Sequence, residues 1–390
     1  MRVWLQRRNL RFVSMAVVVV CSALLVVALS TARHGRSIFG SFLGGDYPAF
    51  YVAGKILNEF PGDRLYDRAL QRRLYHELLP AAAPELSLPF ANPPFAALLF
   101  RPLAFLPYRA SYIVWLLLSL AFFIRGVTWM VRGEDRWTAL WVALSFEPFI
   151  VECWIGGQLS AIGLCAVGLA LDRDRRGQTF AAGLAMGLLL YKPTLLLWIV
   201  PALFVGRRWR TLLGMGVTAG LLVMGSWLAA GWNSCVGYAH LLVDYLRMSV
   251  ATPTVFRVWK FIDLRSFLCQ WLTGQAVLII FAVVAIPVVF LLLQSWMCAD
   301  RRLLWGATLT ATLVANVYVG IYDAVLVIPS LLLTFDAFGN QPPRILITLA
   351  VFTWIVPCFS PGFQFYTLVL AALCIYQLVL LRRFSLESRA

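Results

Sequence analysis

Long apolar stretches, separated by short polar segments, run along most of this chain. The longest of them cover residues 12–29, 112–124, 211–230, 276–293 and 366–381. A helix needs about 20 apolar residues to cross the hydrocarbon core of a bilayer, and these stretches come near that length. The strands of a membrane barrel would instead alternate apolar and polar residues over short segments. The pattern therefore predicts an all-α integral membrane protein.

The polar breaks between the apolar stretches set the expected path through the membrane. Crossings are predicted near residues 12–30, 109–131, 137–151, 157–171, 178–191, 193–206, 210–230, 276–297, 303–320, 323–337, 344–358 and 363–381. This makes about 12 helices, several of them short for a bilayer. Two longer segments, residues 31–108 and 231–275, separate the crossings. We predict one transmembrane domain over residues 1–390, with both longer segments on the same side.

The distribution of charge gives this path a direction. Charged residues make up only 13% of the chain and apolar ones 61%, yet the formal net charge is +15. Basic residues gather before the first crossing and in short loops at 173–176, 207–210, 301–302 and 382–383. Loops rich in Lys and Arg stay on the cytoplasmic side. The two longer segments are therefore predicted on the extracytoplasmic face of a plasma (inner) membrane, behind an uncleaved signal anchor. The positive-inside rule accounts for this basic charge, and no basic run is interleaved with aromatic residues in a solvated domain. Membrane lipids are therefore expected partners, and nucleic acid is not.

The first extracytoplasmic segment is predicted to be structured. Apolar residues follow Asp46 and Asp67 at helical spacing, and Pro93-Pro94 is a typical helix start. The spaced residues are Phe50, Ala53, Gly54 and Leu57 in the first case and Leu70, Leu74 and Leu78 in the second. We expect two amphipathic helices there and an interfacial helix over residues 93–107, lying on the bilayer with their apolar sides toward lipid.

Asp46 is the leading candidate for catalysis. It follows Gly44 and Gly45 and precedes Tyr47 at the start of a predicted helix. One interpretation is an N-cap whose carboxylate accepts backbone N–H bonds. The other is a general base, a fixed carboxylate at the edge of a cavity that takes a proton from an attacking hydroxyl. The two roles are compatible, and the sequence leaves both open.

Further polar residues stand at the ends of predicted crossings. Gln158, after Gly156 and Gly157, is suited to bind a sugar hydroxyl or a neighbouring helix. Lys192 lies between two apolar runs, where an unpaired charge is costly, so we expect it to meet a phosphate or a carboxylate. Asp323 is expected either to bind substrate or to cap its helix.

A cluster of basic residues marks the second extracytoplasmic segment. Arg257 and Lys260 are three residues apart, so a helix would place them on one face, and Arg265 follows. Such cations can neutralise a departing phosphate or reach anionic lipid headgroups. Cys235 and Cys269 lie in the same segment, and a disulfide between them is an alternative that sequence spacing does not decide.

The order of the motifs resembles a known family. The motifs are Gly44-Gly45-Asp46-Tyr47-Pro48-Ala49-Phe50-Tyr51-Val52-Ala53-Gly54, Leu65-Tyr66-Asp67 and Phe90-Ala91-Asn92-Pro93-Pro94-Phe95. They are similar to the first outer loop of polyprenol-phosphate-sugar-dependent glycosyltransferases with the GT-C fold, in particular family 87. Weaker similarity continues through Gly156-Gly157-Gln158-Leu159-Ser160, Lys192-Pro193-Thr194 and Tyr322-Asp323.

This resemblance implies an activity and a set of site residues. The chain is expected to be an inverting glycosyltransferase with Asp46 as general base. It would move a hexose, expected to be mannose, from a polyprenyl-phosphate sugar donor to a lipid-linked or cell-envelope glycan acceptor. Neither a cofactor nor a metal is implied. The residues expected to bind substrate are Tyr47, Tyr51, Asn92, Gln158, Lys192, Arg257, Lys260, Tyr322 and Asp323.

Two other classes of protein remain as alternatives. The chain has no P-loop and no dinucleotide-binding glycine motif, so a donor already dissolved in the membrane fits better than a nucleotide sugar. A transporter or flippase for a lipid-linked or small polar solute would share the polytopic layout, but no half-to-half repeat is visible. A scaffold protein would have no need of a carboxylate at Asp46.

Overall fold

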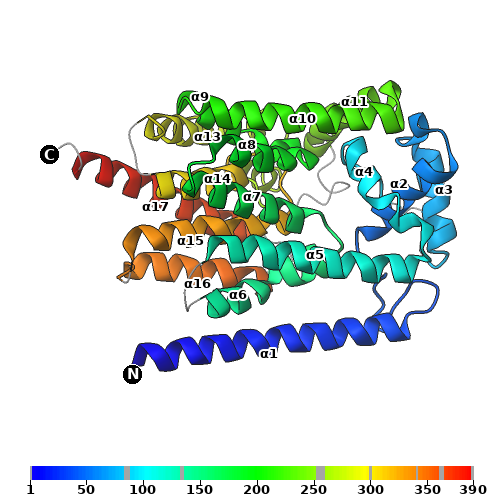
Figure 1. Ribbon diagram of the computed structural model, residues 1–390, viewed down its shortest axis with the longest axis horizontal. Coiled ribbons are helices and arrows are strands. Elements are labelled where there is room, and N and C mark those ends of the chain that lie inside the picture. Colours follow the sequence, from blue (N-terminus) through cyan, green and yellow to red (C-terminus); the bar gives the residue numbers. More distant parts are fainter. Residues whose placement is uncertain are drawn as a thin grey trace. The chain divides into compact units, whose positions relative to one another are not determined.

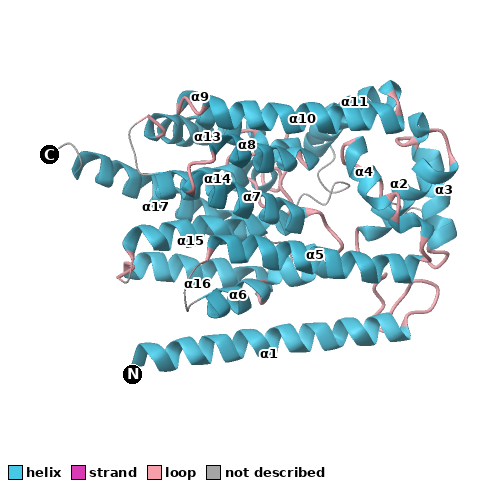
Figure 2. Cartoon of the chain, viewed as in Figure 1, coloured by secondary structure: helices cyan, strands magenta, loops and turns pink. Residues whose placement is uncertain are grey.

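The computed structural model describes residues 2–82, 88–131, 136–251, 260–297, 301–339, 341–359 and 364–387. Over these ranges the chain is almost wholly helical, as Figures 1 and 2 show. Extended backbone within them pairs only as isolated bridges, such as the one between Phe261 and Gly320. The prediction of an all-α protein is confirmed.

Six helical stretches are long and apolar enough to cross a membrane, within the described ranges and by length and composition. They are Arg8–Thr31, Tyr108–Met130, Trp209–Ala230, Gln275–Ser295, Ile321–Phe338 and Phe365–Phe384. A seventh arises if Arg136–Leu144 and Pro148–Ile155, which meet at a bend of 63°, form one broken span. Three shorter apolar helices lie where further crossings were predicted. They are Thr179–Tyr191, Pro193–Val205 and Arg344–Phe359. The count of about 12 crossings stays a prediction.

The described chain gathers into two compact units, and each is taken by itself below. The first contains residues 1–128, 132–165 and 217–243, and the second contains residues 129–131, 166–216 and 244–390. Helices α7 (Ser160–Arg175), α10 (Trp209–Ala230) and α11 (Trp232–Ala251) contribute to both. The single transmembrane domain expected over the whole chain stays a prediction.

The first unit joins long apolar helices to the helices of the first polar segment. Helix α1 packs on α6 and on the π-helical η3, and α2 packs on α3, α4 and η2 (Figure 1). The elements are α1 (Arg2–Thr31), α2 (Tyr47–Glu59), η1 (Gly62–Arg64), α3 (Arg68–Leu78), α4 (Pro94–Phe100), η2 (Leu103–Phe105), α5 (Tyr108–Met130), α6 (Arg136–Leu144) and η3 (Pro148–Ile155).

The helices predicted after Asp46 and Asp67 are present as α2 and α3. Their apolar residues face each other, because Val52 and Ile56 of α2 pack against Leu70 and Leu74 of α3. In α2 every residue except Lys55, Asn58 and Glu59 is buried. An apolar side directed toward lipid is therefore not supported for α2, since its apolar residues contact protein.

The helix predicted over residues 93–107 is shorter than expected. It begins at Pro94, as the Pro-Pro pair predicts, but α4 ends at Phe100 and a separate 3-10 turn, η2, follows Pro102. A proline has no N–H to donate, so it cannot continue the hydrogen-bond ladder of the helix before it.

Asp67 caps α3, so its replacement should lower the stability of the first polar segment. Its Oδ1 accepts the Leu70 N–H at 3.0 Å and its Oδ2 pairs with Arg64 at 2.6 Å, and both contacts hold its pKa below the usual value. Asp67→Ala should lower the free energy of unfolding by about 1 kcal/mol at neutral pH.

The pH dependence of this effect has a definite sign. A carboxyl whose pKa is lowered by folding adds stability above its unfolded pKa, about 3.9, and loses it as the pH falls further. The difference between Asp67→Ala and the wild type should therefore shrink between about pH 5 and pH 3 in thermal unfolding scans. Asp63→Ala, in the exposed 3-10 turn η1 before α3, is the control and should change little. An equal loss at both positions would contradict the capping role.

The second unit is organised around α14, which packs on α15 and α17. Its elements are α8 (Thr179–Gly187), η4 (Leu188–Tyr191), η5 (Pro193–Leu196), α9 (Ile199–Val205), α12 (Leu264–Leu268), α13 (Gln275–Ser295), α14 (Arg301–Val314), η7 (Ile321–Leu326), α15 (Val327–Phe338), α16 (Arg344–Phe359) and α17 (Gln364–Glu387).

A polar cluster joins the three central helices of this unit. The Gln377 amide of α17 donates to the hydroxyls of Ser330 and Thr334 on α15, each at 2.8 Å. Ser330 also bonds to Thr310 and to the Gly306 carbonyl of α14. Buried hydrogen bonds of this kind hold helices together where lipid offers no hydrophobic driving force between them.

Candidate active site

Two glycine pairs bring Asp46 and Gln158 together within the first unit. Gly44 and Gly45 have φ of 88° and 53°, in the left-handed region that glycine tolerates. The backbone of the second pair comes so close that a Cβ on Gly157 would lie 2.6 Å from the Tyr47 Cβ. The Asp46 N–H donates to the Gly156 carbonyl at 2.9 Å. The two turns are therefore packed backbone to backbone, and larger residues would push them apart.

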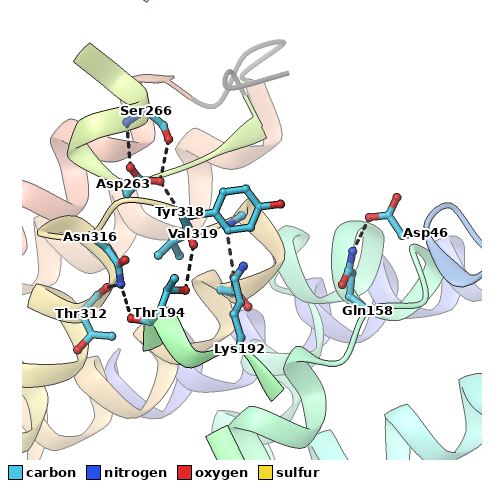
Figure 3. A network of polar contacts seen from close by, with 12 residues as sticks. Asp46, Gln158, Lys192, Thr194, Asp263, Ser266, Thr312, Asn316, Tyr318 and Val319 are labelled. Atoms are coloured by element: carbon cyan, nitrogen blue, oxygen red, sulfur yellow. Dashed lines mark hydrogen bonds and ion pairs between the residues drawn. The ribbon is translucent and has the colours of Figure 1, made fainter. Parts of the chain in front are cut away.

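The Asp46 carboxylate does not cap helix α2. Asp46 stands at the N-cap position, but its backbone is in the right-handed helical region and its side chain makes no capping hydrogen bond. The capping interpretation is therefore wrong for the side chain. Its Oδ2 instead accepts a hydrogen bond from the Gln158 amide, as Figure 3 shows. Asp46 is half-buried, and its carboxylate is held by this neighbour.

The backbone around Gln158 is fixed by side chains of α5. Tyr112 donates to the Ile155 carbonyl at 2.5 Å and Trp115 donates to the Gly157 carbonyl at 3.1 Å. The Gln158 N–H bonds to the Cys153 carbonyl at 2.8 Å, at the end of the π-helical turn η3. Gln158 itself is only 9% exposed. Its amide is thus held in one place, where it orients Asp46.

The side chains of Tyr47 and Tyr51 are buried and hydrogen-bonded within the protein. Tyr47 is fully buried, and its hydroxyl shares a hydrogen bond of 2.6 Å with Ser111. Tyr51 is buried and donates to the Leu106 carbonyl at 2.8 Å. Both tyrosines support the turn that carries Asp46. Substrate contact with Tyr47 would require its side chain to leave this position.

Asn92 lies beside the tyrosine of the Leu65-Tyr66-Asp67 motif. Its carbonyl accepts the Tyr66 hydroxyl at 2.6 Å, and the Tyr66 ring stacks on Phe90 with centroids 6.1 Å apart. Two motifs far apart in the sequence are therefore joined at the start of α4. The half-buried Asn92 side chain remains a candidate for substrate binding.

Lys192 and Asp323 form a buried ion pair in the second unit. Lys192 lies between the 3-10 turns η4 and η5, and Asp323 lies in η7. Asp323 is fully buried and Lys192 is 8% exposed. The ammonium also lies over the rings of Tyr322 and Tyr318, at 4.7 and 5.2 Å from their centroids. Of the alternatives for Lys192, the structure shows the carboxylate partner.

The predicted crossing at 303–320 ends early, because α14 stops at Val314 and residues 315–320 are not helical. Side chains from elsewhere in the second unit bind the backbone of this segment, as Figure 3 shows in part. Trp198 donates to the Ala315 carbonyl, Thr194 to that of Tyr318 and Arg265 to that of Val317. We refer to residues 315–320 as the extended segment.

Two polar residues that support the extended segment were not assigned roles from the sequence. Asn316, fully buried, donates to the Thr194 and Thr312 carbonyls, each at 2.8 Å. Asp263, also fully buried, accepts the Val319 N–H at 2.9 Å and caps α12 through Ser266. The one sequence signal for Asp263 was the Asp-x-x-Ser spacing of a helix start.

The remaining predicted residues are less well placed. Arg257 lies outside the described residues. Lys260 is half-buried beside the bridge between Phe261 and Gly320. Cys235 and Cys269 are free thiols, so the alternative of a disulfide between them is not observed. Among the described residues, no group of three His, Cys, Asp or Glu side chains is arranged to hold a metal ion.

Comparison with known proteins assigns the chain to a family. The model of glycosyltransferase family 87 matches residues 90–329, a range that includes Gln158, Lys192, Asp263 and Asp323 and begins after Asp46. The chain is 27% identical over 195 residues to the polyprenol-phosphate-mannose-dependent alpha-(1-2)-phosphatidylinositol pentamannoside mannosyltransferase of Mycolicibacterium smegmatis. That alignment spans 48% of this chain and 46% of the mannosyltransferase, so about half of each. No solved structure matches the chain. Since the family model covers more than half of its residues, the chain belongs to glycosyltransferase family 87.

Proposed function

We propose that this protein is an inverting mannosyltransferase of the GT-C type that takes mannose from a polyprenyl-phosphate donor. The acceptor would be a lipid-linked or cell-envelope glycan, reached from the extracytoplasmic face of the plasma (inner) membrane. Family membership supports sugar transfer, and the name of the mycobacterial relative supports both the donor and the sugar. The apolar helices that are long enough to cross a membrane support an active site served by lipid substrates. The bundle of about 12 crossings is part of the proposal.

The observation that carries the proposal is the structural environment of the Asp46 carboxylate. It is not used as a helix cap, it is half-buried, and it is oriented by the buried Gln158 amide. A general base requires this combination of access and fixed geometry. The proton of the acceptor hydroxyl passes to Asp46 while that oxygen forms a bond to C1 of the mannose. The bond from C1 to the phosphate oxygen breaks, polyprenyl phosphate leaves, and the configuration at C1 inverts.

A second requirement of this reaction is a cation for the phosphate that departs. Lys192 is our principal candidate, with Arg257 and Lys260 as additional cations from the second polar segment. In the structure the Lys192 charge is balanced by Asp323 and covered by Tyr318 and Tyr322. The donor phosphate is a diester with one negative charge, and it gains a second as polyprenyl phosphate leaves. It would therefore compete with the Asp323 carboxylate for the Lys192 ammonium most strongly as the bond to C1 breaks. Tyr322 and Asp323 would then belong to the same phosphate-binding region.

Purified protein in lipid nanodiscs provides the test of this function. We expect transfer of labelled mannose from polyprenyl-phosphate mannose to a glycolipid acceptor, and none from guanosine-diphosphate mannose. A panel that includes polyprenyl-phosphate glucose and several envelope glycolipids would identify sugar and acceptor. Transfer from the nucleotide sugar alone would overturn the proposed donor class, and lipid-linked solute movement without any transfer would favour a flippase.

A further inference from the structure

The backbone of the extended segment needs hydrogen-bond partners, and neighbouring side chains provide them. Non-helical backbone buried among apolar helices leaves N–H and C=O groups that need partners. Side chains satisfy these groups at several positions from Ala315 to Gly320, and they come from residues 194–198, 263–265 and 323. These hydrogen bonds hold the extended segment in one conformation, so the groups that it carries have fixed positions.

The segment carries two of the groups that enclose the Lys192–Asp323 pair. The Tyr318 ring lies 5.2 Å from the Lys192 ammonium, and the Gly320 N–H donates to the Asp323 carboxylate at 3.2 Å. Val319 lies between these two residues. Its N–H is bound by Asp263 at 2.9 Å, and its carbonyl accepts the Ile262 N–H at 2.8 Å. The two bonds to Val319 therefore fix the backbone between Tyr318 and Gly320.

Asp263 is the side chain on which this arrangement depends most. It is fully buried and accepts three hydrogen bonds: the Ser266 N–H on Oδ1 at 2.9 Å, and on Oδ2 the Ser266 hydroxyl and the Val319 N–H, each also at 2.9 Å. All three partners are donors, so both oxygens must accept. An Ala side chain accepts none of them, so Asp263→Ala leaves the Val319 N–H without this acceptor.

We propose that Asp263 is a positioning residue for the Lys192–Asp323 pair. Its carboxylate holds the Val319 backbone, so that the Tyr318 ring covers Lys192 and the Gly320 N–H binds Asp323. The packing of Phe261 on Tyr318, with ring centroids 4.6 Å apart, adds to the same restraint from the same short stretch of chain. The effect on donor binding rests on the function proposed above, whereas the effect on Lys192 exposure does not.

A role as an ordinary helix cap would depend on different hydrogen bonds of Asp263 than a positioning role. A cap of the five-residue helix α12 needs only the bonds from Ser266, whereas positioning needs the bond from Val319. Ser266→Ala removes the hydroxyl bond and keeps both backbone N–H bonds, so it is the matched control. Under our proposal Asp263→Ala affects Lys192 strongly, and Ser266→Ala affects it weakly.

Modification of Lys192 by a water-soluble amine reagent, followed by mass spectrometry, measures this directly. The chain has three lysines, and the partly exposed Lys55 of the first unit is the internal standard. Asp263→Ala should raise the Lys192 modification rate by roughly tenfold or more, because a buried Val319 N–H without an acceptor favours local opening by such a factor. Alkylation of the buried Cys374 reports whether the second unit stays folded.

The outcomes separate the two roles. A faster Lys192 reaction with unchanged Cys374 alkylation supports positioning. If Asp263→Ala and Ser266→Ala leave Lys192 equally protected, or if Lys192 and Cys374 become reactive together, Asp263 is a structural cap only and the proposal is overturned. In turnover assays Asp263→Ala should raise KM for the lipid-phosphate donor more than it lowers kcat. Should the wild type show no transfer, the proposed function fails while the modification result still decides the role of Asp263.

Discussion

Replacing Asp46 by Asn should lower the turnover of sugar transfer by roughly 100-fold or more, the usual scale for losing general-base help. Stability should hardly change. The Asn carbonyl oxygen can still accept the hydrogen bond from the Gln158 amide, and the side chain of Asp46 caps no helix. Asn differs from Asp mainly in its inability to take a proton at neutral pH. Initial rates with lipid donor, together with thermal unfolding in detergent, measure both quantities on one preparation.

Asp46→Ala, measured in the same assays, tests the capping role of the Asp46 side chain. If the Asp46 side chain were a cap, this change would cost about 1 kcal/mol of stability. Because the structure shows no capping bond, any stability that the Ala variant loses relative to the Asn variant should come from the lost Gln158 hydrogen bond, and both variants should have equally low turnover. Asp63→Asn, on the exposed part of the same polar segment, is the activity control. Near-normal turnover in Asp46→Asn would remove Asp46 from catalysis and make Glu147 the next carboxylate to test.

Local patterns were sufficient to predict the helices of the first polar segment. Apolar residues at helical spacing after Asp46 and Asp67 became α2 and α3, and Asp67 caps α3 as an aspartate at a helix start often does. Spacing did not predict the fate of the Asp46 carboxylate. Its partner, Gln158, lies 112 residues away, and two tight glycine turns bring them together. Such a contact depends on tertiary packing, which no local rule describes.

Hydropathy was less informative where helices break. The predicted crossing at 137–151 is divided between α6 and the π-helical η3, and the expected helix over 303–320 gives way to the extended segment. In the second case, side chains from distant parts of the chain satisfy the non-helical backbone, as Asp263 does for the Val319 N–H. A charge in an apolar stretch did identify Lys192 as a residue that needs a partner. It did not choose Asp323, 131 residues away, from among the acids of the chain.

Removing Lys192 should destabilise the second unit far more than removing an exposed charge would. Lys192→Met leaves Asp323, which is fully buried, without its cation. Deleting one partner of a buried ion pair costs about 3–5 kcal/mol, because the remaining charge stays desolvated. Chemical unfolding in detergent, followed through Trp fluorescence, should show this loss, and use of the lipid-phosphate donor should fall with it.

Two further variants identify the cause of that loss. Lys192→Met combined with Asp323→Asn removes both charges and keeps an acceptor for the Gly320 N–H, so it should recover most of the stability. It should not recover transfer, because the cation for the phosphate is still absent. Arg302→Met breaks the exposed pair with Asp336 in the same unit and should cost at most about 1 kcal/mol. Full activity in the double variant would show that Lys192 serves the fold alone, and the phosphate site would then have to be sought at Lys260 and Arg257.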